Sequence, residues 1–312
     1  FFYMMAVLFR VVFFLCLVVG AAAAEEEEIA LPVVDLAADS GEALLRALRD
    51  VGAAVVEGHG VEALDEVLDA TRRLFRHADQ PPFREDRGFL GPGGESGGPG
   101  VVEAKESFAF KKAGNAWPPS FPDEDRGLFA RAFAQLCTAA HRVVALLPMD
   151  PRCCDADADD ASLARLFHYL PADPRVFVGS APHTDWGLMT FVLADQPGLE
   201  LLVDENDWRP PSESSSRLVL HAGDFMAMTL AGVRSPRHRV RVHPDRDRFS
   251  LVFFYYPDSD APVPTESAVA GLSLNECQAD DPAACASSSP PRTFGALVAK
   301  KWAQVRRQQQ TP

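Results

Sequence analysis

The feature that most constrains this chain is a series of short strand-like segments between about residues 160 and 260. Segments rich in Val, Phe and Leu alternate there with Pro, Gly and Asp at spacings of about ten residues. Short, regularly spaced strands are typical of antiparallel barrels and jelly rolls, because tight turns join their neighbouring strands. We therefore expect this region to form an all-β unit.

The preceding region mixes strands and helices. Short strands are expected over residues 29–36 and 53–57, and Ser40 is a suitable helix N-cap between them. Apolar residues at helical spacing predict helices over about 64–75, 125–147 and 293–307. Stretches rich in Pro, Gly or acidic residues predict loops over 80–100 and 155–160. The chain as a whole is thus expected to be α+β.

Composition limits the partners of the chain. Of its 312 residues, 47% are apolar, so it can bury a large core. Its formal net charge of -14 creates a negative field that repels phosphate backbones and anionic membrane surfaces. We therefore expect no nucleic-acid partner.

The first residues have the pattern of a targeting segment. Residues 1–19 are almost wholly apolar and contain Arg10, and Ala21 to Ala24 precede Glu25. A positive residue, an apolar stretch and small residues together favour a cleavable secretory signal. We therefore expect a protein of the secretory pathway or the extracellular space. An uncleaved membrane anchor and a cytoplasmic location are the alternatives.

The cysteines say less about the compartment of the protein. Cys277 and Cys285 flank a short acidic loop and could form a disulfide in an oxidising compartment, with free thiols as the alternative. An odd number of cysteines follows the N-terminal segment, which argues against a complete disulfide framework.

Two histidines and an aspartate have the spacing of a metal site. His183 and Asp185 lie two residues apart, so on an extended segment both side chains point to the same face. His238 follows about fifty residues later on an alternating strand, where Val240 and Val242 share its inward face. Two imidazoles and one carboxylate form a facial triad that leaves coordination positions open, which suits non-haem Fe(II). Taken alone, however, a His-x-Asp pair is most often a surface turn.

Arg248 and Ser250 are again two residues apart on a predicted strand, where they face inward with Val252 and Phe254. An arginine on an apolar face requires an anion, and its planar guanidinium matches a carboxylate with two hydrogen bonds. The serine hydroxyl supplies a further hydrogen bond. A structural salt bridge to one of the many acidic residues is the alternative interpretation.

Together these motifs resemble those of the 2-oxoglutarate and Fe(II)-dependent dioxygenases, specifically the isopenicillin N synthase-like branch. The similar segments follow one another through nearly all of the chain after the apolar N-terminus; they are Leu31-Pro-Val-Val-Asp-Leu36, Gly58-His-Gly-Val61, Arg87-Gly-Phe, Lys105-Glu-Ser-Phe108, His183-Thr-Asp-Trp-Gly-Leu-Met-Thr190, Gly223-Asp224, Ser235-Pro-Arg-His-Arg-Val240 and Arg248-Phe-Ser250. One segment departs from the pattern. Where many members read Asn-Tyr-Tyr-Pro, this chain reads His168-Tyr-Leu-Pro171, and Leu170 cannot donate a hydrogen bond.

The resemblance implies a double-stranded β-helix (jelly-roll) core with packed helices and an N-terminal α/β region. It implies that His183, Asp185 and His238 are the metal ligands and catalytic residues, and that Arg248 and Ser250 bind 2-oxoglutarate as co-substrate. The expected reaction consumes molecular oxygen, converts 2-oxoglutarate to succinate and CO2, and oxidises a small organic metabolite; ascorbate is an optional addition. The expected parts are a signal or anchor, an N-terminal domain, a catalytic domain, and a C-terminal loop and helix, over residues 1–24, 29–150, 160–260 and 261–312.

Two other functions stay open on the sequence alone. Some proteins of this fold are Fe(II) oxidases that use no 2-oxoglutarate, and their Arg-x-Ser pair binds a substrate carboxylate instead. A non-catalytic, secreted jelly-roll binding domain is the second alternative, and the intact triad counts against it. Fold analogy does not choose among small metabolites as the substrate.

The targeting segment gives the first testable prediction. In a eukaryotic host, we expect the full chain to enter the secretory pathway and the mature protein to begin near Glu25. Cell fractionation and N-terminal sequencing of the purified protein measure this. An intact N-terminus on a cytosolic protein would contradict the expectation.

Overall fold

The computed structural model describes residues 27–38, 40–84, 86–94, 103–150, 154, 156–212, 217–264 and 292–301. The predicted signal segment and the pair Cys277 and Cys285 lie outside these residues, so both expectations stay predictions. In the part of the chain that is described, no helix is both long and apolar enough to cross a membrane.

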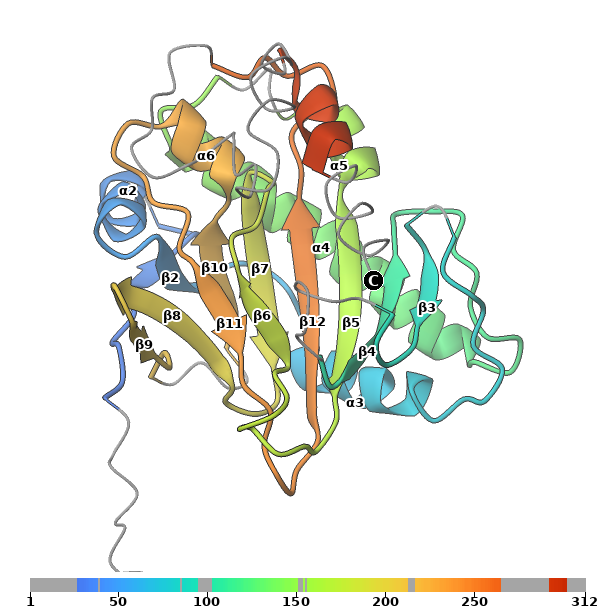
Figure 1. Ribbon diagram of the computed structural model, residues 1–312. Helices are drawn as coiled ribbons and strands as arrows, with labels where there is room; N and C mark the ends of the chain where they lie inside the picture. Colours follow the sequence, from blue (N-terminus) through green and yellow to red (C-terminus); the bar gives the residue numbers. More distant parts are fainter. Residues whose placement is uncertain are drawn as a thin grey trace, which may run out of the picture.

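Eight strands form a large sheet in the order β1-β2-β10-β7-β12-β5-β4-β3 (Figure 1). Its strands are Val33–Asp35 (β1), Ala53–Glu57 (β2), Gly88–Leu90 (β3), Lys105–Phe110 (β4), Leu163–Tyr169 (β5), Met189–Ala194 (β7), Val219–Ala222 (β10) and Arg248–Tyr255 (β12). Only the pair of β1 and β2 is parallel among the paired strands of the described residues. Because β4 pairs with β5, the sheet continues from the N-terminal half into the strand-rich half.

A second sheet of four strands, in the order β6-β11-β8-β9, lies in front of the large sheet in Figure 1. Its strands are Ser180–His183 (β6), Leu199–Asp204 (β8), Asp207–Arg209 (β9) and His238–Val240 (β11). Two sheets that face each other form the jelly-roll core expected from the spacing of the strands.

Helices cover the opposite face of the large sheet. The helices α3 (Leu64–Leu74) and α4 (Asp123–Leu146) both contact β12, and α2 (Gly41–Asp50) contacts β2. The short helix α6 (Asp224–Thr229) follows β10 directly, and residues 294–301 are helical as well. The result is a helical layer, a large sheet and a small sheet (Figure 1).

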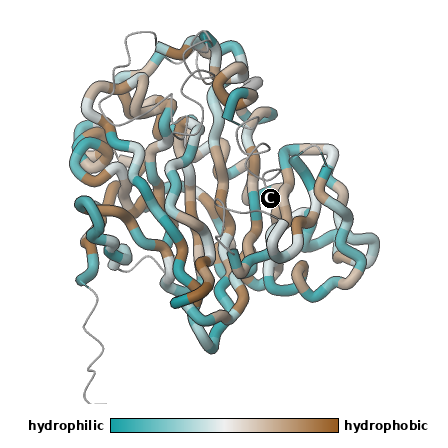
Figure 2. Tube along the Cα trace, viewed as in Figure 1, coloured by the Kyte–Doolittle hydropathy of each residue, from teal (hydrophilic) through white to brown (hydrophobic). Residues whose placement is uncertain are grey.

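The central strand β12 separates two clusters of buried residues. Leu251, Phe253 and Tyr255 belong to the core between the large sheet and the helices, whereas Val252 belongs to the cluster between the two sheets. This division follows from the alternation of side chains along a strand. In Figure 2 the central strands are accordingly hydrophobic along much of their length.

Most expected elements are confirmed, and three local expectations are wrong. The acidic stretch 155–160 contributes to a helix, α5 (Ala156–Ala161), because its carboxylates have partners rather than only water: Asp159 pairs with His141 and Asp160 with Lys112, both at 3.0 Å. The strand β3 lies within the expected loop 80–100, where it pairs with β4. Ser40 precedes α2 as expected but makes no capping hydrogen bond, because its hydroxyl donates to the carbonyl of Asp35 at 2.5 Å.

His168 joins three segments on the side of β5 that faces away from the small sheet. Its ring nitrogens lie 2.7 Å from Glu106 of β4 and 2.6 Å from Asp247, the residue before β12, and its ring stacks on Phe249. Burial lowers the pKa of His168, but hydrogen bonds to the two carboxylates raise it further, so the net pKa is raised. The charged imidazolium is therefore the form that the fold favours.

This arrangement predicts a pH-dependent contribution to stability. Because the folded-state pKa of His168 lies above its unfolded value of 6.5, its stabilisation is present in full below pH 6.5 and is lost as the pH rises through the raised pKa. Chemical unfolding of the protein and of His168→Gln should therefore differ more at about pH 6 than at about pH 9. His243→Gln, a change at an exposed histidine, is the control. A difference that stays constant across this range would contradict the prediction.

Candidate active site

A cavity of about 280 Å³ lies between the two sheets, close in size to known small-molecule sites. Inward-facing side chains of β5, β6, β10, β11 and β12 line it. All five site residues expected from the sequence contribute to its wall: His183, Asp185, His238, Arg248 and Ser250.

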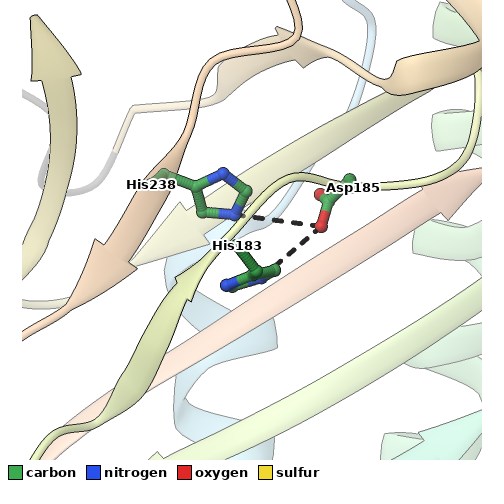
Figure 3. Close-up of side chains that lie close together, drawn as sticks. All are labelled: His183, Asp185 and His238. Carbon is green, nitrogen blue, oxygen red and sulfur yellow. Dashed lines mark ion pairs between the residues drawn. The ribbon is translucent and has the colours of Figure 1, made fainter. Parts of the chain in front are cut away.

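The triad residues converge at one place in this wall (Figure 3). His183 is the last residue of β6, and Asp185 lies two residues further along the chain. His238 is the first residue of β11. Nε2 of His183 lies 3.6 Å from Oδ1 of Asp185, and Nε2 of His238 lies 3.8 Å from the same oxygen. One ligand atom from each residue lies within 4.8 Å of the others, roughly the span of two ligands that bind one ion at 2.0–2.2 Å each.

Hydrogen bonds at the far side of each imidazole fix which nitrogen faces the site. Nδ1 of His183 lies 2.7 Å from the carbonyl of Ala181, and Nδ1 of His238 lies 3.1 Å from the carbonyl of Pro236. A carbonyl can only accept, so each Nδ1 carries the proton and donates it. The lone pair of each Nε2 is then free for a metal ion.

The charge states also suit a divalent cation. Burial lowers the pKa of His183 and neighbouring His238 lowers it further, so its imidazole stays neutral at neutral pH. Its side chain is nevertheless 46% exposed, because it borders the cavity. Burial raises the pKa of Asp185, but His238, His221 and His183 lower it by more, so the carboxyl group is ionised. The triad therefore offers the anionic carboxylate of Asp185 and the neutral imidazole of His183 to a metal ion.

Arg248 and Ser250 stand further along the same cavity with unsatisfied polar atoms. Arg248 is 5% exposed, its Nε donates to the carbonyl of Gln196 at 3.0 Å, and its guanidinium lies 4.8 Å from the centre of the Tyr169 ring. Within the described residues, Nη1 of Arg248 and Oγ of Ser250 have no hydrogen-bond partner. No described carboxylate pairs with Arg248, so the salt-bridge interpretation is wrong for this part of the chain.

The structure places one further residue of the sequence pattern in the site and adds one that the pattern did not single out. Tyr169, the possible co-substrate contact of the His168-Tyr-Leu-Pro171 segment, lines the cavity beside Arg248. His221 on β10 also lines the cavity, near Asp185. Its alternation with inward-facing Val219 was the signal that could have identified it.

A buried ion pair supports the strand that ends in His183. Glu103 and Lys105 lie 3.0 Å apart in the cavity wall. Glu103 also accepts a hydrogen bond from the backbone of Ala181 at 2.8 Å, and Lys105 donates to Ser180 at 3.0 Å. These contacts tie β4 and the residues before it to β6.

Comparison with known proteins agrees with this site. The model of the 2OG-Fe(II) oxygenase superfamily matches residues 161–257, which contain the whole triad and the Arg248-Phe-Ser250 segment. Gibberellin 3-beta-dioxygenase 1 of Oryza sativa subsp. japonica is 30% identical over 75% of this chain and 70% of its own length. The chain therefore belongs to the 2OG-Fe(II) oxygenase superfamily, a family of oxidoreductases.

Two further proteins extend the comparison. The 2-oxoglutarate-dependent dioxygenase caaD of Aspergillus niger is 29% identical over 67% of this chain and 75% of its own length. The crystal structure of JOX2 in complex with 2OG, Fe and JA has a TM-score of 0.63 and 23% sequence identity, and the match covers 77% of this chain and 79% of that one. The jelly-roll fold expected from the sequence is thus confirmed.

The triad geometry predicts the effect of removing its carboxylate. Asp185→Ala should abolish tight binding of Mn(II), a stand-in for Fe(II), because the site loses its one anionic ligand. The variant should still fold, as judged by circular dichroism, since Asp185 lies at the cavity and not among the packed apolar residues. Asp69→Ala, a change at a largely exposed carboxylate of α3, is the control. Unchanged Mn(II) affinity in Asp185→Ala, measured by calorimetric titration, would refute the ligand assignment.

Proposed function

We propose that this protein is a 2-oxoglutarate-dependent oxygenase that binds Fe(II) through His183, Asp185 and His238 and 2-oxoglutarate through Arg248 and Ser250. Its second substrate is a small organic metabolite, and its products include succinate and CO2. Bound Fe(II) supplies the activation of molecular oxygen.

The N-terminal segment supports a location in the secretory pathway, and the motif order supports the four-part division of the chain.

One observation carries the proposal: Nη1 of Arg248 and Oγ of Ser250, two buried polar atoms without a hydrogen-bond partner among the described residues, lie in the wall of the same small cavity as three convergent metal ligands. A buried guanidinium without an anion is strongly unfavourable, so the position requires an anionic ligand. 2-Oxoglutarate has carboxylates at both ends and a keto group beside one of them. One end can therefore bind at Arg248 while the other reaches the metal.

The residues around this position hold the co-substrate in one orientation. The guanidinium of Arg248 presents its free Nη1 and the serine presents its hydroxyl, so the distal carboxylate can accept a hydrogen bond from each. Tyr169 lies against the guanidinium and restricts its movement. Val252 and Val192 provide apolar walls that exclude water from the rest of the carbon chain.

The remaining wall of the cavity is left for the second substrate. It is partly aromatic, with Trp186, Phe254 and Tyr256, and Arg165 adds a cation. A mixed wall of this kind suits a small molecule with an apolar body and a few polar groups. The names of the relatives, which refer to gibberellin and to jasmonate-induced oxygenase among others, are in keeping with such a substrate class.

The oxidase alternative makes a different prediction for the same residues. An oxidase that uses no 2-oxoglutarate would use Arg248 to bind its substrate and would release no succinate. Release of succinate in proportion to the oxidised product therefore separates the two functions.

Arg248→Lys tests the role of the arginine. Lysine keeps the positive charge but loses the planar fork, so the variant should need more 2-oxoglutarate while its Fe(II) affinity changes little. Loss of one of two charge-assisted hydrogen bonds costs on the order of 1.5–3 kcal/mol, which is roughly ten- to a hundredfold in the apparent affinity for 2-oxoglutarate. Ser250→Ala removes a neutral donor and should have a smaller effect.

Steady-state measurement of succinate release at varied 2-oxoglutarate gives the required constants. Arg237→Lys, at an exposed arginine just before β11, is the matched control and should behave as the unaltered protein. Arg248→Lys could instead require the same 2-oxoglutarate concentration as the unaltered protein and bind some other carboxylate more weakly. In that case Arg248 binds the carboxylate of the oxidised substrate, and the protein is an oxidase.

A further inference from the structure

His221 is a buried imidazole in the cavity wall that neither the triad nor the co-substrate position uses. Its side chain is 1% exposed, and within the described residues neither ring nitrogen has a hydrogen-bond partner. A buried polar group without a partner destabilises the fold, and an apolar residue could fill the same space without that penalty. We therefore infer that the imidazole contributes to the binding of a ligand.

The geometry around Asp185 indicates what that role is. Oδ1 of this carboxylate faces Nε2 of His183 and of His238. Oδ2 accepts a hydrogen bond from Thr190 at 2.5 Å and lies 3.6 Å from Nε2 of His221. The two oxygens therefore have different neighbours: the other two triad residues lie near Oδ1, and Thr190 and His221 lie near Oδ2.

The position of the two protein groups is set by strand pairing. Thr190 on β7 and His221 on β10 are direct partners in the antiparallel register. Partners of this kind place their side chains next to each other on the same face of a sheet. Two neighbouring strands thus present a hydroxyl and an imidazole to a single carboxylate oxygen.

We propose that His221 is a positioning residue for Asp185. Thr190 already donates a hydrogen bond to Oδ2, and Nε2–H of His221, 3.6 Å from the same oxygen, closes to hydrogen-bond distance when Asp185 binds the metal ion, so that this carboxylate binds the ion through Oδ1 alone. The inference rests on the metal site of the proposed function. A facial triad would leave three positions of an octahedral ion open, and a chelating co-substrate together with oxygen would use all three. If Oδ2 also bound the ion, it would occupy one of these positions. Holding Oδ2 away from the ion therefore keeps all three coordination positions open for the co-substrate and oxygen.

Two substitutions of similar size test the proposal in the full-length protein. His221→Gln keeps an N–H group at the reach of Nε2, whereas His221→Leu fills the space without any donor. Mn(II) affinity is measured by titration, and the water molecules on bound Mn(II) are counted from the relaxation rate of water protons. Loss of a group that orients a metal ligand typically lowers metal affinity about tenfold or more.

We expect His221→Leu to bind Mn(II) about tenfold more weakly and to hold about one third fewer water molecules on it, because Oδ2 replaces one of the three. His221→Gln should recover both values. The metal-free form of His221→Leu should melt no lower than the unaltered protein, because without the metal ion neither ring nitrogen of His221 has a hydrogen-bond partner among the described residues. Val219→Ala, on the same face of β10, is the control: it should lower the melting temperature and leave Mn(II) hydration unchanged.

Three results would overturn the inference. The first is unaltered Mn(II) affinity and hydration in His221→Leu. The second is an equal loss in His221→Leu and His221→Gln, and the third is a fall in metal affinity that only accompanies a fall in the metal-free melting temperature. If the unaltered protein binds no Mn(II), the proposed function fails as well, and this outcome is distinct from the other three.

Discussion

The pairing register of β6 and β11 is the constraint on which the site depends. His183 and His238 are direct partners across these two strands, so their rings lie 4.3 Å apart between centroids. A slip of one residue would turn one histidine to the opposite face of the small sheet and separate the pair. Pairing of His238 with Leu201 of β8 fixes β11 from its other side. The metal geometry is therefore set by backbone hydrogen bonds, and the imidazoles only need to follow their strands.

The two faces of β12 explain how the fold tolerates unsatisfied polar atoms in the cavity. Phe253 and Tyr255 pack into the helix-covered core, and this apolar burial stabilises the strand. Arg248 and Ser250 face the cavity from the same strand, and Nη1 of the one and Oγ of the other have no hydrogen-bond partner in the part of the chain that the structure describes. Stability and ligand binding thus come from opposite faces of one element. A change on the cavity face can alter binding while the packed face continues to hold the strand.

The sequence predicted those site residues whose positions follow from local periodicity. Alternation along a strand is a property of neighbouring residues, so His183 with Asp185, and Arg248 with Ser250, could be assigned to common faces before any fold was known. The jelly roll followed from the spacing of short strands. The metal and co-substrate roles came from the order of the motifs, which is a family resemblance and not a physical derivation.

The roles of residues that depend on distant partners could not be predicted in this way. Alternation with Val219 could place His221 on the inward face, but its position near Asp185 depends on the pairing of β10 with β7, two segments about thirty residues apart in the chain. The helix α5 lies in an acidic stretch whose carboxylates pair with His141 and Lys112, both distant in sequence. Local composition predicted a solvated loop there, and tertiary contacts overrode it. Tyr169 was a possible co-substrate contact on the sequence alone, and the pairing of β5 with β12 places it beside Arg248.

The local chain around each histidine orients its imidazole. In both cases the carbonyl two residues earlier, of Ala181 or of Pro236, accepts the Nδ1 proton. This contact needs no distant residue and sets the tautomer as soon as the strand forms. The carboxylate of Asp185 depends instead on tertiary neighbours, because Thr190 and the surrounding imidazoles orient it and keep it ionised. Of the three ligands, the aspartate is therefore the one whose geometry the rest of the fold must control.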